Sequence, residues 1–201
     1  DKYSLAARVK GLEDVVDISQ DGYWWTKDPN YVTHTCAIAN AGRVYCWGGA
    51  GLGQSGSPGS SGNPKKHIEP KEVHGLPGVA LQVEVGIAHS CALMNVGGTK
   101  RVYCWGSNEM GQLGANEKST SHSFAPKLVH VGADGLPPSE RVVSLSAGAN
   151  RGCAIMSNKR SYCWGLNDNG QIGDGTSGPG NYRFSPTESL FLRPVQNRYI
   201  Y

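Results

Sequence analysis

The sequence predicts an all-β fold of about three β-propeller blades, which makes the chain an incomplete propeller or a segment of a larger one. Three observations predict this class. One segment recurs three times, apolar and polar residues alternate within each copy, and no stretch of ten or more residues shows a capped helical stripe. The 28 glycines and 11 prolines among 201 residues also indicate a chain rich in tight turns.

The recurring segment combines three short motifs in a fixed order. The first is Cys-Ala-(Ile/Leu), preceded two residues earlier by His or Arg; the second is Tyr-Cys-Trp-Gly; the third is Gly-Gln-x-Gly. The tryptophans of the second motif stand at spacings of 58 and 59 residues, at Trp47, Trp105 and Trp164. Because chance does not produce three such matches, the chain is built from repeats. We expect the recurring tryptophans to pack in the core or between blades.

Each copy contains the strands of one propeller blade. An apolar stretch that ends in a turn comes first, at residues 15–19, 81–86 and 142–148. Further along the second copy, Val102 and Cys104 alternate with their neighbours as in a half-buried strand. Gly97-Gly98 lies midway between the two cysteines of that copy, where a tight hairpin needs positive φ. Each copy therefore holds three or four short antiparallel strands.

The combined motif resembles the repeat of the regulator of chromosome condensation family, whose members are β-propellers, usually of seven blades. The resemblance covers roughly residues 9–190. It implies that His34 and His89 occupy a position that serves packing and hydrogen bonding. The third copy departs from this pattern because Arg151 stands there, which argues against a shared chemical role for the position.

The family's repeat opens with a proline, which fits Pro70, Pro126 and Pro186. We therefore interpret the chain as one propeller segment, 1–201, with repeats at approximately 9–69, 70–125 and 126–185, and with 186–201 as the start of a further blade or a closing strand. Propellers typically close with about four to eight blades, so three blades leave two open ends. Three arrangements would cover these open ends: further blades of a longer parent protein, self-association of the chain, or a partner that binds the ends.

The six cysteines form one pair in each repeat, and each pair brackets one hairpin. The pairs are Cys36 with Cys46, Cys91 with Cys104, and Cys153 with Cys163. Residues opposite each other on neighbouring strands have Cα atoms about 4.5 to 5.5 Å apart, within reach of a disulfide. We therefore expect each pair to form a disulfide. Reduced, buried thiols are the alternative. A zinc site is disfavoured because paired zinc ligands are usually separated by only about two to four residues, and the two cysteines of each pair here are farther apart in the sequence. Disulfides indicate an oxidising compartment, at the cell surface or outside the cell.

The sequence contains no constellation typical of an enzyme. His-Glu-x-x-His, Gly-x-Ser-x-Gly and Gly-Lys-Ser/Thr motifs are absent, so we expect no catalytic residue, no metal and no cofactor. Residues 167–174 lack the alternation and the final Glu of a calcium loop, and we interpret them as a turn. With a net charge of +3 and no long basic run, nucleic-acid binding is not expected. The apolar runs are too short for membrane insertion.

The candidate binding residues lie in an insertion that interrupts the repeat pattern. Residues 22–31 contain four aromatic side chains, namely Tyr23, Trp24, Trp25 and Tyr31. Inserted loops of repeat proteins project from one face, and Tyr and Trp are favoured interface anchors. We therefore predict that these four residues bind a partner. The alternative is a loop that folds back over an open blade edge.

Two functions fit these observations. In the first, the chain is an extracellular, non-catalytic module that binds a protein or a surface glycan, or that forms part of a surface or filament assembly. Self-association or neighbouring subunits would then cover the open blade edges. In the second, it is an intracellular regulator of the same repeat family, acting in guanine-nucleotide exchange or the ubiquitin pathway. The paired cysteines and the lack of catalytic motifs favour the first.

Overall fold

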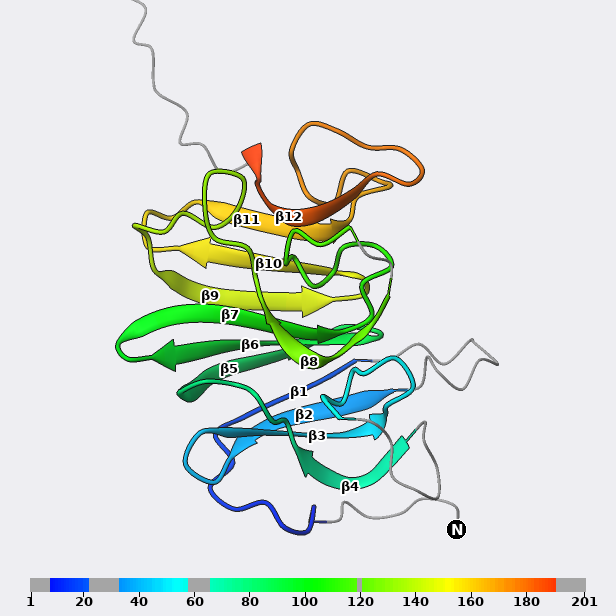
Figure 1. Ribbon diagram of the computed structural model, residues 1–201, viewed down its shortest axis with the longest axis vertical. Helices are drawn as coiled ribbons and strands as arrows, with labels where there is room; N and C mark the ends of the chain where they lie inside the picture. The colour runs from blue at the N-terminus through cyan, green and yellow to red at the C-terminus, as the bar shows by residue number, and fades with distance from the viewer. Residues whose placement is uncertain (1–7, 22–32, 58–65, 119–120, 191–201) are drawn as a thin grey trace, which may run out of the picture.

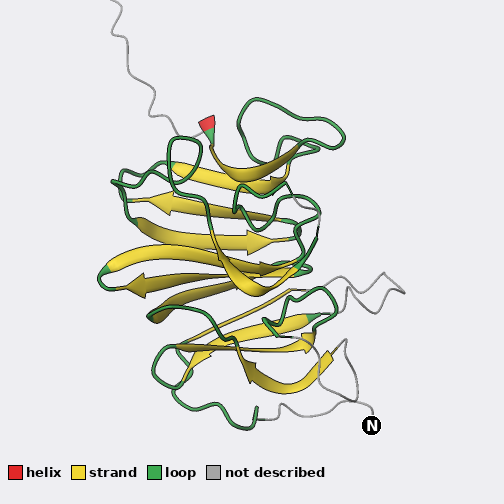
Figure 2. Ribbon diagram, in the orientation of Figure 1, coloured by secondary structure: helices red, strands yellow, loops and turns green. Residues whose placement is uncertain are grey.

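The computed structural model describes residues 8–21, 33–57, 66–118 and 121–190, which form three four-stranded antiparallel sheets. Each sheet is a meander, and the three are stacked along the long axis of the molecule (Figure 1). Strands and loops make up almost all of the described chain, which has a single 3₁₀-helical residue, Leu190, at its end and no α-helix (Figure 2). No helical segment of these residues is long and apolar enough to cross a membrane. The predicted all-β fold of about three blades is confirmed.

Twelve strands make up the three sheets, which we call the first, second and third blades. The first blade contains β1 (Asp17–Asp21), β2 (His34–Ala39), β3 (Arg43–Gly49) and β4 (Lys66–Glu72). The second contains β5 (Val79–Val85), β6 (His89–Val96), β7 (Thr99–Gly106) and β8 (Ser123–Leu128). The third contains β9 (Val142–Gly148), β10 (Arg151–Met156), β11 (Ser161–Leu166) and β12 (Tyr182–Glu188).

A tight glycine turn sets the register of the central hairpin of the second blade. β6 and β7 are joined by Gly97-Gly98, with φ of 57° and 86°. Positive φ at both central positions gives the twist that a two-residue hairpin requires. The register that follows places Cys91 directly opposite Cys104. The hairpin predicted at this position is therefore present.

The blades end later in the chain than the predicted repeats. Pro70, Pro126 and Pro186, interpreted above as the first residues of repeats, lie inside β4, β8 and β12. These are the outer strands of the three sheets, and each pairs with its neighbour through a register shift. Proline has no backbone N–H to donate, so an irregular edge strand accommodates it. Each proline therefore belongs to the last strand of one blade.

Apolar side chains fill the two junctions between blades. The first junction is formed by Cys36, Ile38, Val44, Cys46 and Val73 against Ala80, Val83, Val85, Ala92, Met94 and Trp105. The second is formed by Cys91, Leu93, Val102, Cys104, Leu113, Val129 and Leu136 against Val142, Leu145, Ala154, Met156, Tyr162 and Trp164. Trp105 and Trp164 are fully buried, as predicted. Trp47 is only partly buried, because no described blade packs on its side of the first sheet.

The turns between the two middle strands of each blade and the connections from the third to the fourth strand lie at opposite ends of the strands (Figure 1). The hairpin turns, residues 40–42, 97–98 and 157–160, form what we call the hairpin rim. The described parts of the long connections, residues 50–57, 107–118 and 167–181, form the loop rim. The loop rim carries the Gly-Gln-x-Gly motifs.

Candidate functional site

The Gly-Gln-x-Gly motifs form tight turns that connect the loop rim to the blade junctions. Gln54, Gln112 and Gln171 each accept, at 2.8 Å, a hydrogen bond to Oε1 from the backbone N–H two residues earlier. In the second blade, Asn108 Oδ1 also accepts from Leu113 N–H at 3.2 Å. These side chains satisfy backbone donors of the turns internally and hold the turns in one conformation.

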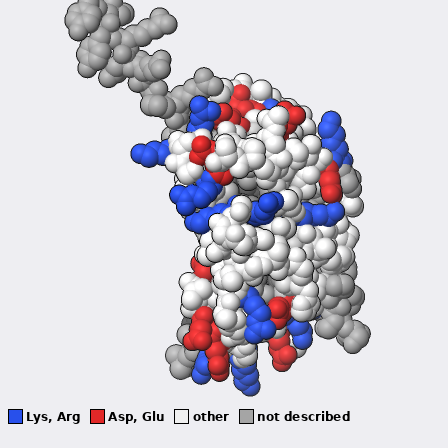
Figure 3. Space-filling view, turned by 60° about the vertical axis from the view of Figure 1, so that its left-hand side comes forward, with Lys and Arg blue, Asp and Glu red and all other residues white. Residues whose placement is uncertain are grey.

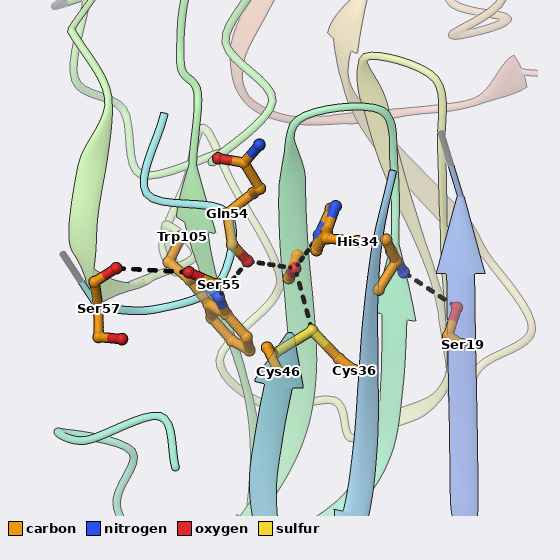
Figure 4. The surroundings of a disulfide bond; sticks show 10 residues. Ser19, His34, Cys36, Cys46, Gln54, Ser55, Ser57 and Trp105 are labelled. Carbon is orange, nitrogen blue, oxygen red and sulfur yellow. Dashed lines mark hydrogen bonds between the residues drawn. A yellow bond between two sulfur atoms is a disulfide. The ribbon is translucent and has the colours of Figure 1, made fainter. Parts of the chain in front are cut away.

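At the first junction, the carbonyl of Gln54 accepts two hydrogen bonds from the second blade (Figure 4). Trp105 Nε1–H donates at 3.0 Å and Ser90 Oγ–H donates at 2.9 Å. His34 Nε2 lies 2.8 Å from Ser90 Oγ. Because the single hydroxyl proton is directed at Gln54, His34 must donate to Ser90 through Nε2–H. This buried polar layer lies against the Cys36 sulfur, 3.4 Å from Ser90 Oγ.

The second junction repeats only part of this layer. Trp164 Nε1–H donates to the carbonyl of Gln112 at 3.0 Å. Gly152 takes the place of the serine, and a Cβ added there would lie 2.6 Å from the Trp164 ring. His89 corresponds to His34 and therefore faces no hydroxyl. Within the described ranges neither of its ring nitrogens has a hydrogen-bond partner.

Burial keeps both junction histidines neutral. Burial, with a smaller contribution from the neighbouring His89, lowers the pKa of His34 from its ordinary 6.5 to about 3. Burial likewise lowers the pKa of His89 to about 4, against smaller upward effects of the Arg151 backbone and the Asp21 carboxylate. Neither ring is charged at neutral pH, so both act as packing groups and only His34 also acts as a donor.

Each blade has one disulfide between opposed residues of its two middle strands. The bonds join Cys36 to Cys46, Cys91 to Cys104, and Cys153 to Cys163. The pairing is the one that the sequence predicts, and the Cα atoms are 4.1 Å apart in each case. The first two bonds are completely buried in the junctions, whereas Cys153 is partly exposed on the outer side of the third blade.

A polar network holds the third connection of the loop rim. Arg183 contacts the carboxylate of Asp174 through Nε at 2.7 Å and Nη2 at 2.6 Å, and Thr176 Oγ1 donates to it at 2.7 Å. Burial alone would raise the pKa of Asp174, but the hydrogen bonds from Thr176 and Arg183 and the Arg183 charge lower it. In the part of the chain that the structure describes, no group of three or more His, Cys, Asp or Glu could hold a metal ion.

The predicted partner-binding residues lie outside the described residues. They are Tyr23, Trp24, Trp25 and Tyr31, in the connection between β1 and β2. The described residues that flank this connection, Asp21 and His34, pair with each other. The prediction that the four aromatic residues bind a partner therefore stays a prediction.

Sequence reasoning missed the groups that join the blades. The Gly-Gln-x-Gly motif is interpreted above from its glycines, but the carbonyls of Gln54 and Gln112 are the atoms that the next blade binds. Ser90 was also missed, because only one of the three copies makes this contact. The glutamine that recurs in all three copies was the available signal.

Charges of both signs are interspersed on the face that Figure 3 shows. Basic and acidic side chains lie together in its upper and lower parts, and uncharged residues cover the region between them. Ion pairs across neighbouring strands join Arg43 to Glu72 at 3.4 Å and Arg160 to Glu188 at 3.5 Å. This face therefore carries charges of both signs, with a row of basic side chains across the lower edge of its upper part.

Two family models and several proteins match the chain. Models of the regulator of chromosome condensation (RCC1) repeat match residues 81–112 and 142–171, and residues 101–155. The human E3 ubiquitin-protein ligase HERC2 is 33% identical over 144 residues, covering 71% of this chain and 3% of that protein. The ultraviolet-B receptor UVR8 of Arabidopsis thaliana is 29% identical over 150 residues, covering 74% and 31%. The chain thus spans less than a third of these curated relatives.

Solved structures match the fold. Human WBSCR16 superposes with a TM-score of 0.62 at 21% identity, covering 90% of this chain and 39% of that one. Yeast RCC1 (Prp20), in its complex with Kap60, gives 0.64 at 19% identity, covering 79% and 36%. At these identities the likeness shows the shared fold alone. Together with the repeat motifs and the stacked four-stranded blades, these matches show that the chain belongs to the RCC1 repeat family of β-propellers.

Proposed function

We propose that this chain is a non-catalytic binding module that works in an oxidising compartment, at the cell surface or outside the cell, and that engages a protein partner. One observation carries the proposal, namely a disulfide in every blade. Reducing conditions inside cells keep thiols free, so a disulfide repeated once per structural unit favours secretion.

The loop rim supports the binding part of the proposal. Its turns are fixed by side-chain hydrogen bonds, and its third connection is held by Arg183 and Asp174. Loops that a rigid scaffold holds in place are the usual carriers of recognition. We choose a protein partner over a glycan, because the tryptophans that could stack on sugar rings, Trp24 and Trp25, lie outside the described residues. The structurally similar yeast RCC1 (Prp20) binds Kap60 in a crystal structure, and its binding properties to Gsp1p and histones have been described.

The state of the six cysteines in protein from its natural source tests the proposal. Native protein is alkylated in the absence of reductant, and the alkylated cysteines are counted by mass spectrometry before and after reduction. We expect none before reduction and all six after it. Alkylation of all six without reduction would overturn the oxidising-compartment proposal.

A second candidate function is favoured by the 33% identity to HERC2, an E3 ubiquitin-protein ligase. In this alternative the chain is an intracellular regulator, acting in guanine-nucleotide exchange or in the ubiquitin pathway. It predicts free thiols in native protein. It also predicts that the chain accelerates release of labelled GDP from a small GTPase, or that it alters ubiquitin transfer by a ligase. Neither effect is expected from an extracellular module.

A further inference from the structure

The connection between the second and third blades differs from the one between the first and second. It has 13 residues, 129–141, where the other has six, 73–78. Both contain Gly-Leu-Pro, at residues 75–77 and 135–137. The additional residues form a loop on the side of the hairpin rim, beside the third blade (Figure 1). Features shared by all blades build the fold, whereas an insertion found in one repeat is often where a repeat protein binds its partner.

Backbone hydrogen bonds hold the longer connection in one conformation. Leu136 N–H donates to the carbonyl of His130 at 2.9 Å, and Gly132 N–H donates to the carbonyl of Leu136 at 3.1 Å. At the far end of the connection, Arg141 N–H donates to Ser157 Oγ at 3.1 Å, and Ser157 N–H donates to the Arg141 carbonyl at 2.8 Å. The connection is therefore ordered in advance, which lowers the entropy cost of binding a ligand.

An apolar pocket, which we call the rim pocket, opens beside this connection. Its floor consists of buried side chains of the second junction, namely Val102, Leu136, Val142 and Met156. Its volume is about 110 Å³. An apolar cavity of about 150 Å³ can hold a benzene ring, so the rim pocket has room for one aliphatic side chain.

The corresponding place at the first junction is occupied by a side chain of the blade itself. There Val96, two residues after Met94, packs against the core. In the third blade, Asn158 stands two residues after Met156, and it is exposed. The second junction thus lacks the valine that covers the first, and its apolar floor is open to a ligand.

Four basic residues surround the rim pocket, namely Lys100, Arg101, Arg141 and Lys159. Lys100 and Arg101 line it. Arg141 directly precedes β9, and Lys159 N–H donates to the carbonyl of Met156 at 2.9 Å. Among the described residues, none of the four basic side chains forms an ion pair.

The acidic groups of this region have other contacts. Glu140, at the edge of the rim pocket, accepts a hydrogen bond from Ser157 Oγ, and Glu188 pairs with Arg160 at 3.5 Å. Asp134 lines a separate groove, between the connection and β12. Positive charge is therefore in excess around the pocket, on the side of the molecule where Figure 3 shows a row of basic side chains.

We propose that the rim pocket and its four basic residues are a docking site for an acidic segment of a partner protein. One aliphatic side chain of that segment enters the pocket, and its carboxylates lie against Lys100, Arg101, Arg141 and Lys159. Charge complementarity selects the acidic partner. The apolar pocket between the charges selects a polypeptide over a nucleic acid, which could pair its phosphates with the same cations but has no aliphatic side chain to bury.

This docking site lies at the opposite end of the strands from the loop rim. It goes beyond the proposed function and does not depend on the compartment in which the chain works. The thiol count that tests the compartment is unaffected by the result below, so the two proposals can fail separately.

The test measures binding of a short peptide to the full chain by fluorescence anisotropy. The probe is a fluorescein-labelled peptide of sequence Asp-Glu-Leu-Glu-Asp, and a second peptide has alanine in place of the leucine. We expect the leucine peptide to bind about tenfold more tightly than the alanine peptide, because burial of the larger side chain stabilises the complex. We also expect the affinity to fall as the salt concentration rises, because salt screens exposed charges.

Charge reversal places the peptide on the chain. Lys100→Glu with Arg101→Glu weakens binding by about tenfold or more, since two attractions become repulsions. Lys66→Glu with Lys71→Glu is the matched control, because it changes the net charge equally at two exposed lysines of β4 and leaves the affinity unchanged. Thermal unfolding shows whether each variant is folded.

A second variant covers the case in which the first does not fold. Arg141→Glu with Lys159→Glu replaces two exposed side chains whose hydrogen bonds are made by the backbone alone, so the bonds survive the change. We expect the same loss of peptide binding from it.

Three results would overturn the inference. The first is a folded wild-type chain that does not bind the leucine peptide. The second is equal weakening by the variant at the rim pocket and by the control on β4, which would show general attraction between opposite charges. The third is equal binding of the leucine peptide, the alanine peptide and an oligothymidylate of matched charge, which would show that the pocket takes no part.

Discussion

His34 shows how one residue depends on a neighbouring blade for its hydrogen bond. Its Nε2–H donates to Ser90 Oγ, whose own proton goes to the carbonyl of Gln54. The equivalent residue, His89, faces Gly152 and has no such acceptor among the described residues. A neutral ring tolerates this environment, but an imidazolium ion would be desolvated in the interior at a high free-energy cost, which the Asp21 carboxylate offsets only in part.

The two junction histidines make stability dependent on pH. Their folded pKa values, about 3 and about 4, lie below the 6.5 of an exposed histidine. Between these limits the unfolded chain binds more protons than the folded chain, so the free energy of unfolding falls as the pH falls below 6.5. Each histidine removes about 1 kcal/mol per pH unit in this range. Urea unfolding at pH 7, 5.5 and 4.5 measures the effect.

Substitution of a single histidine tests whether the pH dependence of the unfolding free energy comes from the junctions. His89→Gln cannot become protonated, so we expect its unfolding free energy to change less between pH 7 and pH 4.5 than that of the wild type. His74→Gln changes an exposed histidine and is the matched control. Equal pH dependence in all three proteins would contradict the assignment.

At the scale of the structural element, the central hairpin with its disulfide is the repeated unit. Opposite positions on β2 and β3, β6 and β7, and β10 and β11 hold the cysteine pairs. The same bond has different surroundings in different blades. Cys91 and Cys104 are wholly buried in the second junction, while Cys163 is 7% exposed and Cys153 is more exposed on the outer face of the third blade.

Replacing the cysteine pair of one blade with alanine distinguishes the contribution of loop closure to the unfolding free energy from the contribution of side-chain packing. Cys153→Ala/Cys163→Ala costs about 3 kcal/mol, the loop-closure effect expected for such a short ring. Cys91→Ala/Cys104→Ala costs about 1 to 2 kcal/mol more, because it also leaves a cavity in a closed junction. Urea unfolding of the two double variants and the wild type measures both losses. A larger loss from the pair in the third blade would contradict this account of the junction.

At the scale of the whole molecule, stability comes from the contacts between successive blades. The turn glycines are points where two backbones approach closely. A Cβ at Gly111 would lie 2.6 Å from the carbonyl oxygen of Arg183 in the third blade. The equivalent Gly170 has no described blade beyond it, and its nearest atom would be the carbonyl oxygen of Thr176 at 3.4 Å.

This difference predicts unequal effects of one substitution at two equivalent sites. Gly111 and Gly170 have similar φ, 80° and 75°, so Gly→Ala introduces similar backbone strain of about 1 kcal/mol at each. Gly111→Ala also forces the second and third blades apart, and we expect it to cost at least about 2 kcal/mol more than Gly170→Ala. Thermal and urea unfolding of the two variants measure the difference. Equal losses would show that the turn does not join the blades.

The sequence by itself determined the features that arise within one repeat. Alternating residues and the Gly97-Gly98 turn specify strands and hairpin register, because both depend on neighbours close in the chain. Register then places cysteines in opposition, so their pairing was predictable as well. The number of blades followed from counting motifs. The family followed from the same motifs.

Only the tertiary structure decided what each repeat contacts across a junction. Three equivalent tryptophans look alike in the sequence, yet Trp105 and Trp164 are buried and Trp47 is not, because burial depends on whether a blade precedes the residue. The junction is likewise built on a backbone carbonyl, that of Gln54, a group that every residue possesses; the recurring glutamine marks the turn, but not the partner that its carbonyl meets. Local interactions set the blades, and non-local packing sets how they join.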